Sequence, residues 1–281
     1  MNQGALIFAI NSGSIDYVAM AAWNAQNIKK FLNLPTAVVV AKKEHAQNYN
    51  CFSHIIEVGE SDQDQYRFFE DINNVTAWRN ANRTDAYALS PWTQTLLLDA
   101  DYVVNSNCLK YLFSTDLEFS CYRYALDAKT GLAQEWDLNW FGQYKFPQWW
   151  ATVIYFRKTD TSARIFDCMA MIKHNWTHYR DLYGVSSKIY RNDYALSMAL
   201  NIVSGHCLMT HDIPGCLITL TPDVQIQRQH NSFYIQYQDT NNRARYNKLT
   251  NCDFHVMGKK YLGDLIENDR RTGLFDPSHQ Q

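Results

Sequence analysis

Long hydrophobic runs, paired cysteines and low-complexity tracts are all missing from this sequence. No apolar segment reaches the roughly 20 residues of a membrane-spanning helix, and no basic leader precedes the first apolar stretch. The seven cysteines are odd in number and contain no Cys-x-x-Cys pair, which disfavours a disulfide scaffold or a cysteine zinc site. Only 11 glycines and 6 prolines occur in 281 residues, which disfavours a disordered or fibrous chain. We expect a folded protein with reduced thiols, in the cytoplasm and without a membrane anchor.

Neither basic nor acidic residues are in large excess. The 26 basic and 28 acidic residues give a net charge of −2, so the whole molecule has no basic field for nucleic acid. The segment 228–260 is a local exception, with six basic residues against two acidic ones. Such a segment either marks where an anion binds or is a solvated surface with uneven charge. Both interpretations stay open at this point.

Three large enzyme classes lack their signature motifs here. The sequence contains no G-x-S-x-G, no Walker loop and no G-x-G-x-x-G. Their absence disfavours an α/β-hydrolase, a P-loop NTPase and a Rossmann dehydrogenase.

Apolar runs that alternate with helical periodicity predict the fold. Residues 5–10 and 36–41 read as buried strands, and an amphipathic helix between them ends near Leu32, with Ser14 as its N-cap and Asp16 in its first turn. This order indicates a parallel sheet with a right-handed crossover. Further along, the patterns predict a strand at 54–58, a short helix or ordered loop at 61–72, a helix at 84–90 and one continuous strand at 93–104. The expected class is α/β, with a mostly parallel, Rossmann-like central sheet flanked by helices and a smaller mixed portion.

The most apolar of these strands leads into two carboxylates, Asp99 and Asp101, with only Ala100 between them. Ligands collect at the carboxyl ends of the strands in an open parallel sheet. Two carboxylates at such a place raise each other's pKa unless a cation lies between them. Their hard oxygens suit Mg²⁺ or Mn²⁺, which in turn bridge a diphosphate. A solvated turn with two acids is the alternative, and the triplet alone does not decide between them.

A second group of polar residues lies in "FHVMGKK" at 254–260. His255 is a candidate third metal ligand, and an imidazole in the site would favour Mn²⁺ over Mg²⁺. Gly258 would let the backbone approach a phosphate, which Lys259 or Lys260 would neutralise. A surface histidine near two lysines is the alternative interpretation.

On these motifs the chain resembles a GT-A glycosyltransferase, most closely the glycogenin-like retaining group. That group carries a D-x-D at the end of a central strand, a later His-x-x-Gly with a following Lys, and a basic residue on the helix before the D-x-D strand, where Arg83 lies here. Two features depart from the group: "WWATVIYF" at 149–156 replaces its Asn-Ser-Gly strand, and the terminal Lys falls one or two places early. The resemblance implies a single GT-A domain over 1–281, with a nucleotide-sugar half at 1–105 and an acceptor half at 106–281 that contains the histidine segment.

The resemblance also implies a metal-dependent hexosyl- or pentosyltransferase that uses a nucleoside diphosphate sugar, expected to be a UDP-sugar. Asp99, Asp101 and His255 would hold Mn²⁺ or Mg²⁺ and so stabilise the leaving diphosphate. Arg83 and Asp193 would be the catalytic residues, with Asp193 in the sugar pocket, although spacing alone favours an N-cap role for Asp193. The nucleotide sugar would contact Ala9, Asn11, Ser12, Gly13, Arg83, Ala100, Gly258, Lys259 and Lys260.

An aromatic-rich stretch at 135–150 bears on the acceptor, because its seven rings follow neither a helix nor a strand period. Such rings either stack on a sugar or nucleobase or form a loop that covers the sheet. With the basic segment, they suggest hydroxymethylcytosine in phage DNA as the acceptor, and hence the host cytoplasm as the location. A glycan or a protein is the other expected acceptor.

Two other functions remain open from the sequence. One is a non-catalytic carbohydrate- or nucleic-acid-binding module on a transferase-like fold. The other is a sugar nucleotidyltransferase, which the lack of a basic residue in "NSGSIDY" at 11–17 disfavours. The donated sugar, the stereochemistry and the oligomeric state are not predicted.

Overall fold

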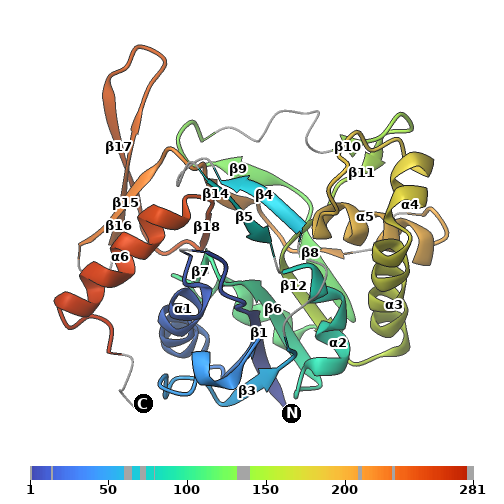
Figure 1. Cartoon of the computed structure of the whole chain (residues 1–281), viewed down its shortest axis with the longest axis horizontal. Coiled ribbons are helices and arrows are strands. Elements are labelled where there is room, and N and C mark those ends of the chain that lie inside the picture. The colour runs from blue at the N-terminus through green and yellow to red at the C-terminus, as the bar shows by residue number, and fades with distance from the viewer. Residues whose placement is uncertain are drawn as a thin grey trace.

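A seven-stranded sheet forms the centre of the computed structural model, which describes residues 2–276 except 14, 60–64, 70–73, 79, 132–139, 208–210 and 230–231 (Figure 1). The strand order is β13-β8-β12-β6-β1-β2-β3. Neighbouring strands are parallel except where β12 is involved, so β12 alone in this sheet runs in the opposite direction. The strands are β1 (Gln3–Phe8), β2 (Thr36–Val40), β3 (His54–Glu57), β6 (Gln94–Asp99), β8 (Phe119–Tyr122), β12 (Trp150–Arg157) and β13 (His211–Asp212).

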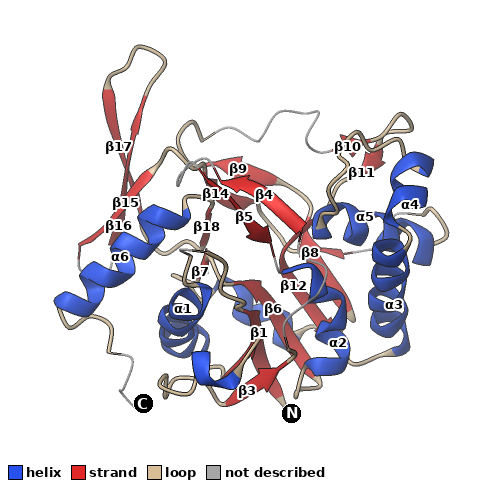
Figure 2. Ribbon diagram, in the orientation of Figure 1, coloured by secondary structure: helices blue, strands red, loops and turns tan. Residues whose placement is uncertain are grey.

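Helices cover both faces of this sheet because successive strand side chains point to opposite sides. Ala5 and Ile7 of β1 pack in a core with α1 (Tyr17–Leu32). Leu6 and Phe8 pack in a second core with α3 (Asp160–His174) and α5 (Asn192–Val203). Figure 2 shows α1 on one side of the sheet and α3 and α5 on the other. The predicted α/β class, with a mostly parallel central sheet flanked by helices, is confirmed.

A smaller second sheet shares the core on the α1 side. Its order is β7-β18-β14-β9, built from β7 (Tyr102–Val103), β9 (Ala125–Asp127), β14 (Leu217–Leu220) and β18 (Phe254–Val256). A three-stranded antiparallel sheet of β15 (Gln225–Gln229), β16 (Ser232–Gln238) and β17 (Ala244–Leu249) follows, and α6 (Lys259–Arg271) packs against β15 and α1. The remaining elements are short: β4 (Gln65–Phe69), β5 (Asn74–Trp78), β10 (Trp140–Phe141), β11 (Phe146–Pro147), α2 (Ala86–Leu89), α4 (Trp176–Leu182), and the 3-10 helices η1 (Lys43–His45), η3 (Asn80–Asp85) and η4 (Cys108–Ser114).

The prediction of one continuous strand over 93–104 is wrong. The chain leaves the central sheet at Asp99, turns through Ala100 and Asp101, and enters the second sheet as β7. There β7 pairs antiparallel with β18, a partner about 150 residues later in the chain. The local pattern could not show this break, because the residues on both sides of it favour β structure.

Two smaller expectations also differ from the structure. The segment 61–72 was expected to be a short helix or an ordered loop, but its part at Gln65–Phe69 is a strand that pairs with Asn74–Trp78. Ser14 lies outside the described residues, and the N-cap of α1 is Asp16, whose Oδ1 accepts a hydrogen bond from the Ala19 amide at 3.0 Å. Asp16 therefore precedes the helix and is not in its first turn.

None of the helices in the described part of the chain combines the length and the apolar character that a bilayer crossing requires.

Candidate active site

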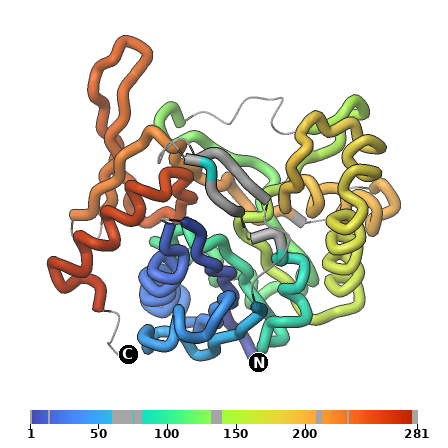
Figure 3. Tube along the Cα trace, in the orientation of Figure 1, coloured from blue at the N-terminus to red at the C-terminus, as the bar shows by residue number. Residues whose placement is uncertain are grey.

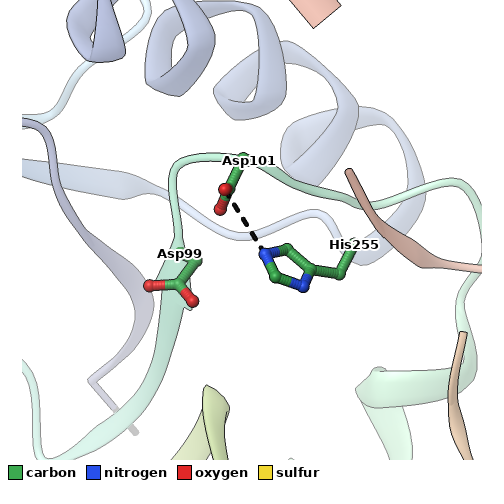
Figure 4. A group of neighbouring side chains, drawn as sticks. All are labelled: Asp99, Asp101 and His255. Carbon is green, nitrogen blue, oxygen red and sulfur yellow. Dashed lines mark ion pairs between the residues drawn. The ribbon is translucent and has the colours of Figure 1, made fainter. Parts of the chain in front are cut away.

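The turn that carries the chain from the central sheet into the second sheet brings two acids and a histidine together. Asp99 ends β6, and Asp101 follows in the turn. Because β7 pairs with β18, His255 lies opposite Tyr102, and the Val256 amide donates to the Asp101 carbonyl oxygen at 2.9 Å. One ligand atom from each of Asp99, Asp101 and His255 lies within 4.8 Å of the others (Figure 4). Backbone pairing thus fixes the histidine beside the acids.

Asp101 is buried between two basic groups. Its Oδ2 forms an ion pair with Lys259 Nζ and lies 3.3 Å from His255 Nε2. Burial alone would raise the pKa of Asp101, but Lys259 and His255 lower it well below its usual value. Asp101 is therefore a carboxylate throughout the neutral range, the form that a metal ligand requires.

Asp99 interacts with Arg83 of η3, whose Nη1 donates to Asp99 Oδ1. Burial raises the pKa of Asp99, the Arg83 guanidinium opposes that shift, and the neighbouring charge of Asp101 adds to it. Arg83 is only 2% exposed, and its Nε and Nη2 have no hydrogen-bond partner among the described residues. Buried unpaired donors are uncommon in proteins, and two on one guanidinium fit an anionic ligand beside the acids.

A cavity of about 220 Å³ opens at these residues. It lies at the carboxyl ends of β1 and β6, where open α/β sheets place their ligands. The predicted site residues that line it are Arg83, Asp99, Ala100, Asp101, Asp193, His255 and Lys259.

Asp193 faces this cavity from the first turn of α5. Its Oδ1 accepts a hydrogen bond from the Ala151 amide at 2.9 Å, and its Oδ2 lies 3.5 Å from Arg191 Nη2. The N-cap of α5 is Arg191, which makes no side-chain capping bond. The alternative that Asp193 caps this helix is therefore wrong, because its carboxylate instead joins α5 to the start of β12.

Four predicted nucleotide contacts follow β1 and lie outside the lining of the cavity. The Ala9 amide continues the sheet by donating to the Val39 carbonyl at 2.8 Å. Asn11 Oδ1 accepts from the Val18 amide at 3.0 Å, which supports the start of α1. Ser12 is buried in a short bridge with Ile15, and Gly13 adopts a φ of 57°, a conformation that favours glycine.

Two further predicted contacts lie at the start of α6. Gly258 is the N-cap of the helix, and a Cβ there would come within 3.1 Å of the Pro222 carbonyl oxygen. Lys260 lines a second cavity, of about 340 Å³, between α1 and α6 together with Asp16 and Arg270. Lys259 is therefore the lysine of the pair that reaches the acids.

Sequence reasoning did not identify several residues that line the active-site cavity. For Trp150 and Thr152 the reason is the reversed direction of β12, which sets the first residues of this strand beside the end of β6, with Val153 opposite Leu98. Trp150 is 7% exposed, and its Nε1 has no partner among the described residues. The aromatic density of "FPQWW" was a signal for this position but did not indicate the strand's direction. The lining residues outside the predicted set are Phe8, Ile10, Tyr17, Trp150, Ala151, Thr152, Arg191, Asn192 and Met257.

The rest of the aromatic stretch belongs mainly to the core where it is described. Phe141 and Trp149 are 7% and 4% exposed, whereas Tyr144 is 67% exposed. Trp136 lies outside the described residues. Of the two interpretations of these rings, core packing therefore holds for Phe141 and Trp149.

The donor set of the site fits a divalent cation. Two carboxylates and one imidazole from Asp99, Asp101 and His255 combine hard oxygen ligands with one nitrogen, which suits Mn²⁺ or Mg²⁺. Arg83 and Lys259 add positive charge around these acids. The arrangement can therefore hold an ion and a multiply charged anion next to each other.

No protein-family model and no curated protein matches this sequence. Among solved structures, the glycosyltransferase GlyE of Streptococcus pneumoniae TIGR4 is similar at 10% identity and a TM-score of 0.42, over 75% of this chain and 45% of GlyE. The galactosyltransferase LgtC, in complex with donor and acceptor sugar analogs, is similar at 14% identity and a TM-score of 0.43, over 70% of each chain. The inositol-1-phosphate CTP transferase from T. maritima is similar at 11% identity and a TM-score of 0.39, over 76% of this chain and 86% of that one. The chain spans less than half the length of GlyE. At these scores the similarities do not indicate a function. The residues that line the cavity are the basis for the function proposed below.

Proposed function

We propose that this chain is a metal-dependent GT-A-type glycosyltransferase that moves a sugar from a nucleoside diphosphate sugar to an acceptor hydroxyl. The observation that carries the proposal is the convergence of Asp99, Asp101 and His255 with Arg83 and Lys259 at one cavity. The first three form a ligand set for a divalent cation, and the last two supply fixed positive charge. This is the chemistry that a departing diphosphate needs.

Asp99, Asp101 and His255 would hold a divalent cation, which would supply positive charge to stabilise the diphosphate leaving group. Arg83 contributes two guanidinium nitrogens that are not used within the described protein. Lys259 is the first residue of α6, where a helix N-terminus also favours negative charge. These two side chains would bind and orient the phosphates from opposite sides of the acids.

Asp193 is the residue we assign to the sugar. Its carboxylate is oriented by the Ala151 amide, and its second oxygen faces Arg191. A carboxylate fixed in this way can accept hydrogen bonds from sugar hydroxyls and hold the ring in one orientation. Trp150 lines the same cavity and offers an apolar ring surface to the substrate.

The finer features follow the resemblance found in the sequence. We propose a UDP-sugar donor, Mn²⁺ as the preferred ion because of the imidazole ligand, and a hexosyl or pentosyl group as cargo in a glycogenin-like enzyme. Residues 1–105 would bind the donor, including Ala9, Asn11, Ser12 and Gly13, and residues 106–281 would bind the acceptor. An acceptor in phage DNA and a cytoplasmic location belong to the same proposal.

A thermal-shift assay with nucleotides and Mn²⁺ tests the proposal. We expect UDP and Mn²⁺ together to raise the melting temperature of the wild type, because ligands that bind the native state stabilise it. Asp101→Asn should lose this shift and also lose Mn²⁺-dependent release of UDP from UDP-sugars. Asp167→Asn is the matched control, because Asp167 is an exposed carboxylate on α3.

Product release and thermal shift together separate the rival functions. Release of pyrophosphate from UTP or CTP with a sugar phosphate would indicate a nucleotidyltransferase. A shift with sugars that is unaffected by Mn²⁺ and by Asp101→Asn would indicate a binding module. If no nucleoside diphosphate or nucleotide sugar gives a Mn²⁺-dependent shift, the glycosyltransferase proposal is wrong.

A further inference from the structure

A hairpin of β16, β17 and their turn, residues 232–249, stands away from the rest of the molecule (Figures 1 and 3). We refer to it as the arm. Its base is fixed to the protein, since Phe233 and Ile235 are buried in the core and Tyr237 donates to the Lys129 carbonyl oxygen at 2.7 Å. The Asn247 side chain adds a bond to the Ala128 carbonyl oxygen at 2.9 Å. The arm is therefore held in a defined orientation.

The arm carries positive charge on a negatively charged protein. It contains Arg243, Arg245 and Lys248 against one acid, Asp239. The chain has 26 basic and 28 acidic residues, so removing the arm's three and one leaves the remainder with a net charge of −4. All three basic side chains are exposed. The arm is thus a basic extension of a protein whose remainder carries a net negative charge.

The single acid of the arm is already engaged. Asp239 accepts hydrogen bonds from the Asn241 and Arg243 amides at 2.9 and 3.0 Å and from Arg245 Nε at 2.9 Å. These bonds close the turn and lower the pKa of Asp239. Asp239 therefore acts as a structural group of the turn. It keeps its negative charge, which Arg245 offsets, and the arm as a whole has a net charge of +2 from three basic residues and one acid.

One face of the arm combines amide, aromatic and basic side chains. Strand register pairs Tyr234 with Lys248 and Gln236 with Tyr246 on this face, so Lys248 is the basic side chain that β17 places here. Arg245 lies opposite Tyr237 on the other face, and Arg243 lies in the turn. Lys248 Nζ lies 5.8 Å from the centre of the Tyr234 ring, and Tyr246 is 65% exposed. Lysine and arginine bind phosphates, and glutamine amides read base edges in a groove. No carboxylate interrupts this face, all of whose residues the structure describes.

We propose that the arm is a contact surface for duplex DNA. Beyond Gln236, where its pairing with β15 ends, the arm is a two-stranded β-ribbon, which fits the major groove, and its basic side chains complement the phosphate backbone. After Leu249 the chain runs through four residues to β18, which carries His255, so the base of the arm adjoins the metal-binding site. On the proposed function, the duplex held by the arm would carry the acceptor hydroxyl.

Fluorescence anisotropy with a labelled duplex tests this inference without requiring catalysis. The triple variant Arg243→Gln, Arg245→Gln, Lys248→Gln removes the basic side chains of the arm. We expect it to bind at least about tenfold more weakly at about 100 mM salt, and the slope of log K against log salt to fall by about two to three. The matched control changes three exposed lysines of the remainder, Lys29→Gln, Lys110→Gln and Lys188→Gln, and should bind as the wild type does.

The outcomes separate this inference from the proposed function. Both triple variants alter exposed positions, and their melting temperatures verify that they are folded. The inference is overturned if the wild type shows no salt-dependent duplex binding, if the two triple variants weaken equally, or if the arm variant loses binding to oligosaccharides and not to DNA. A persistent Mn²⁺- and UDP-dependent thermal shift in those cases would leave the glycosyltransferase proposal standing. If the duplex binds through the arm but UDP and Mn²⁺ give no thermal shift, the inference about the arm stands and the glycosyltransferase proposal is wrong.

Discussion

Asp269 joins three elements through one carboxylate oxygen. It is fully buried in α6, and its Oδ2 accepts hydrogen bonds from Trp23 Nε1 of α1 and from Arg228 Nη1 of β15, each at 2.9 Å. The Arg228 side chain is 11% exposed. A charge pair so far from water is sensitive to the loss of either partner, because the remaining charge stays buried without compensation.

We expect Asp269→Asn to lower the free energy of unfolding by about 3–5 kcal/mol. Asparagine keeps the shape and can still accept from Trp23, but it leaves the Arg228 charge without a counter-charge. Arg228→Met should have an effect of the same size, because it leaves the Asp269 charge unbalanced. The double variant contains neither charge, so its loss should fall short of the sum of the two single losses by at least about 1 kcal/mol.

Urea unfolding followed by tryptophan fluorescence measures these free energies. Glu267→Gln is the control, because Glu267 lies on the same helix in an exposed ion pair with Arg271 at 3.1 Å. That change should alter stability by no more than about 0.5 kcal/mol. If the two single losses add in the double variant to within about 0.5 kcal/mol, the reasoning about Asp269 is refuted.

Glycine substitutions and the Cys51 thiol give four further predictions. Gly4→Ala should destabilise by about 1–3 kcal/mol, because a Cβ there would lie 2.3 Å from Trp92 Cε2, and an unchanged melting temperature would contradict that packing. Gly263→Ala should stabilise by about 0.5–1 kcal/mol, because this position in α6 has nothing within 4 Å of an added Cβ; a lower melting temperature would count against it. Burial raises the pKa of Cys51 to about 12, so native Cys51 should react with iodoacetamide far more slowly at pH 8 than the exposed Cys216, as mass mapping would show. Because the unfolded thiol ionises near pH 8.5, the contribution of Cys51 to stability should fall as pH rises from about 8.5 toward 12.

The first two strands of the central sheet could be predicted because they are short apolar runs buried on both faces. "ALIF" and "TAVVV" carry this pattern without help from distant residues, and both form strands. The ligand set could be proposed for a different reason. Asp99, Asp101 and His255 have the right chemical types, and the resemblance supplied their grouping, which backbone pairing in the structure accounts for.

The remaining features depend on pairings between distant segments. The two acids mark the end of β6, but the pairing of β7 with β18, which draws the chain into the second sheet, has no local signal. The direction of β12 determines that Trp150 reaches the cavity, but a strand's direction has no periodic signature. The N-cap alternative for Asp193 is wrong for a related reason, since the hydrogen-bond partner of this carboxylate, Ala151, lies 42 residues earlier in the chain.

The break after Asp99 has a mechanical consequence. Asp99 belongs to the central sheet, whereas His255 belongs to the second sheet and Asp101 is bonded to it through Val256. An ion bound by all three would act as a cross-link, so the two sheets would open less independently once it is present. At a concentration 100 times the dissociation constant, such a ligand adds about 2.7 kcal/mol to the stability of the native state. Amide protons of β7 and β18 should then exchange more slowly with deuterium, together with those at the end of β6.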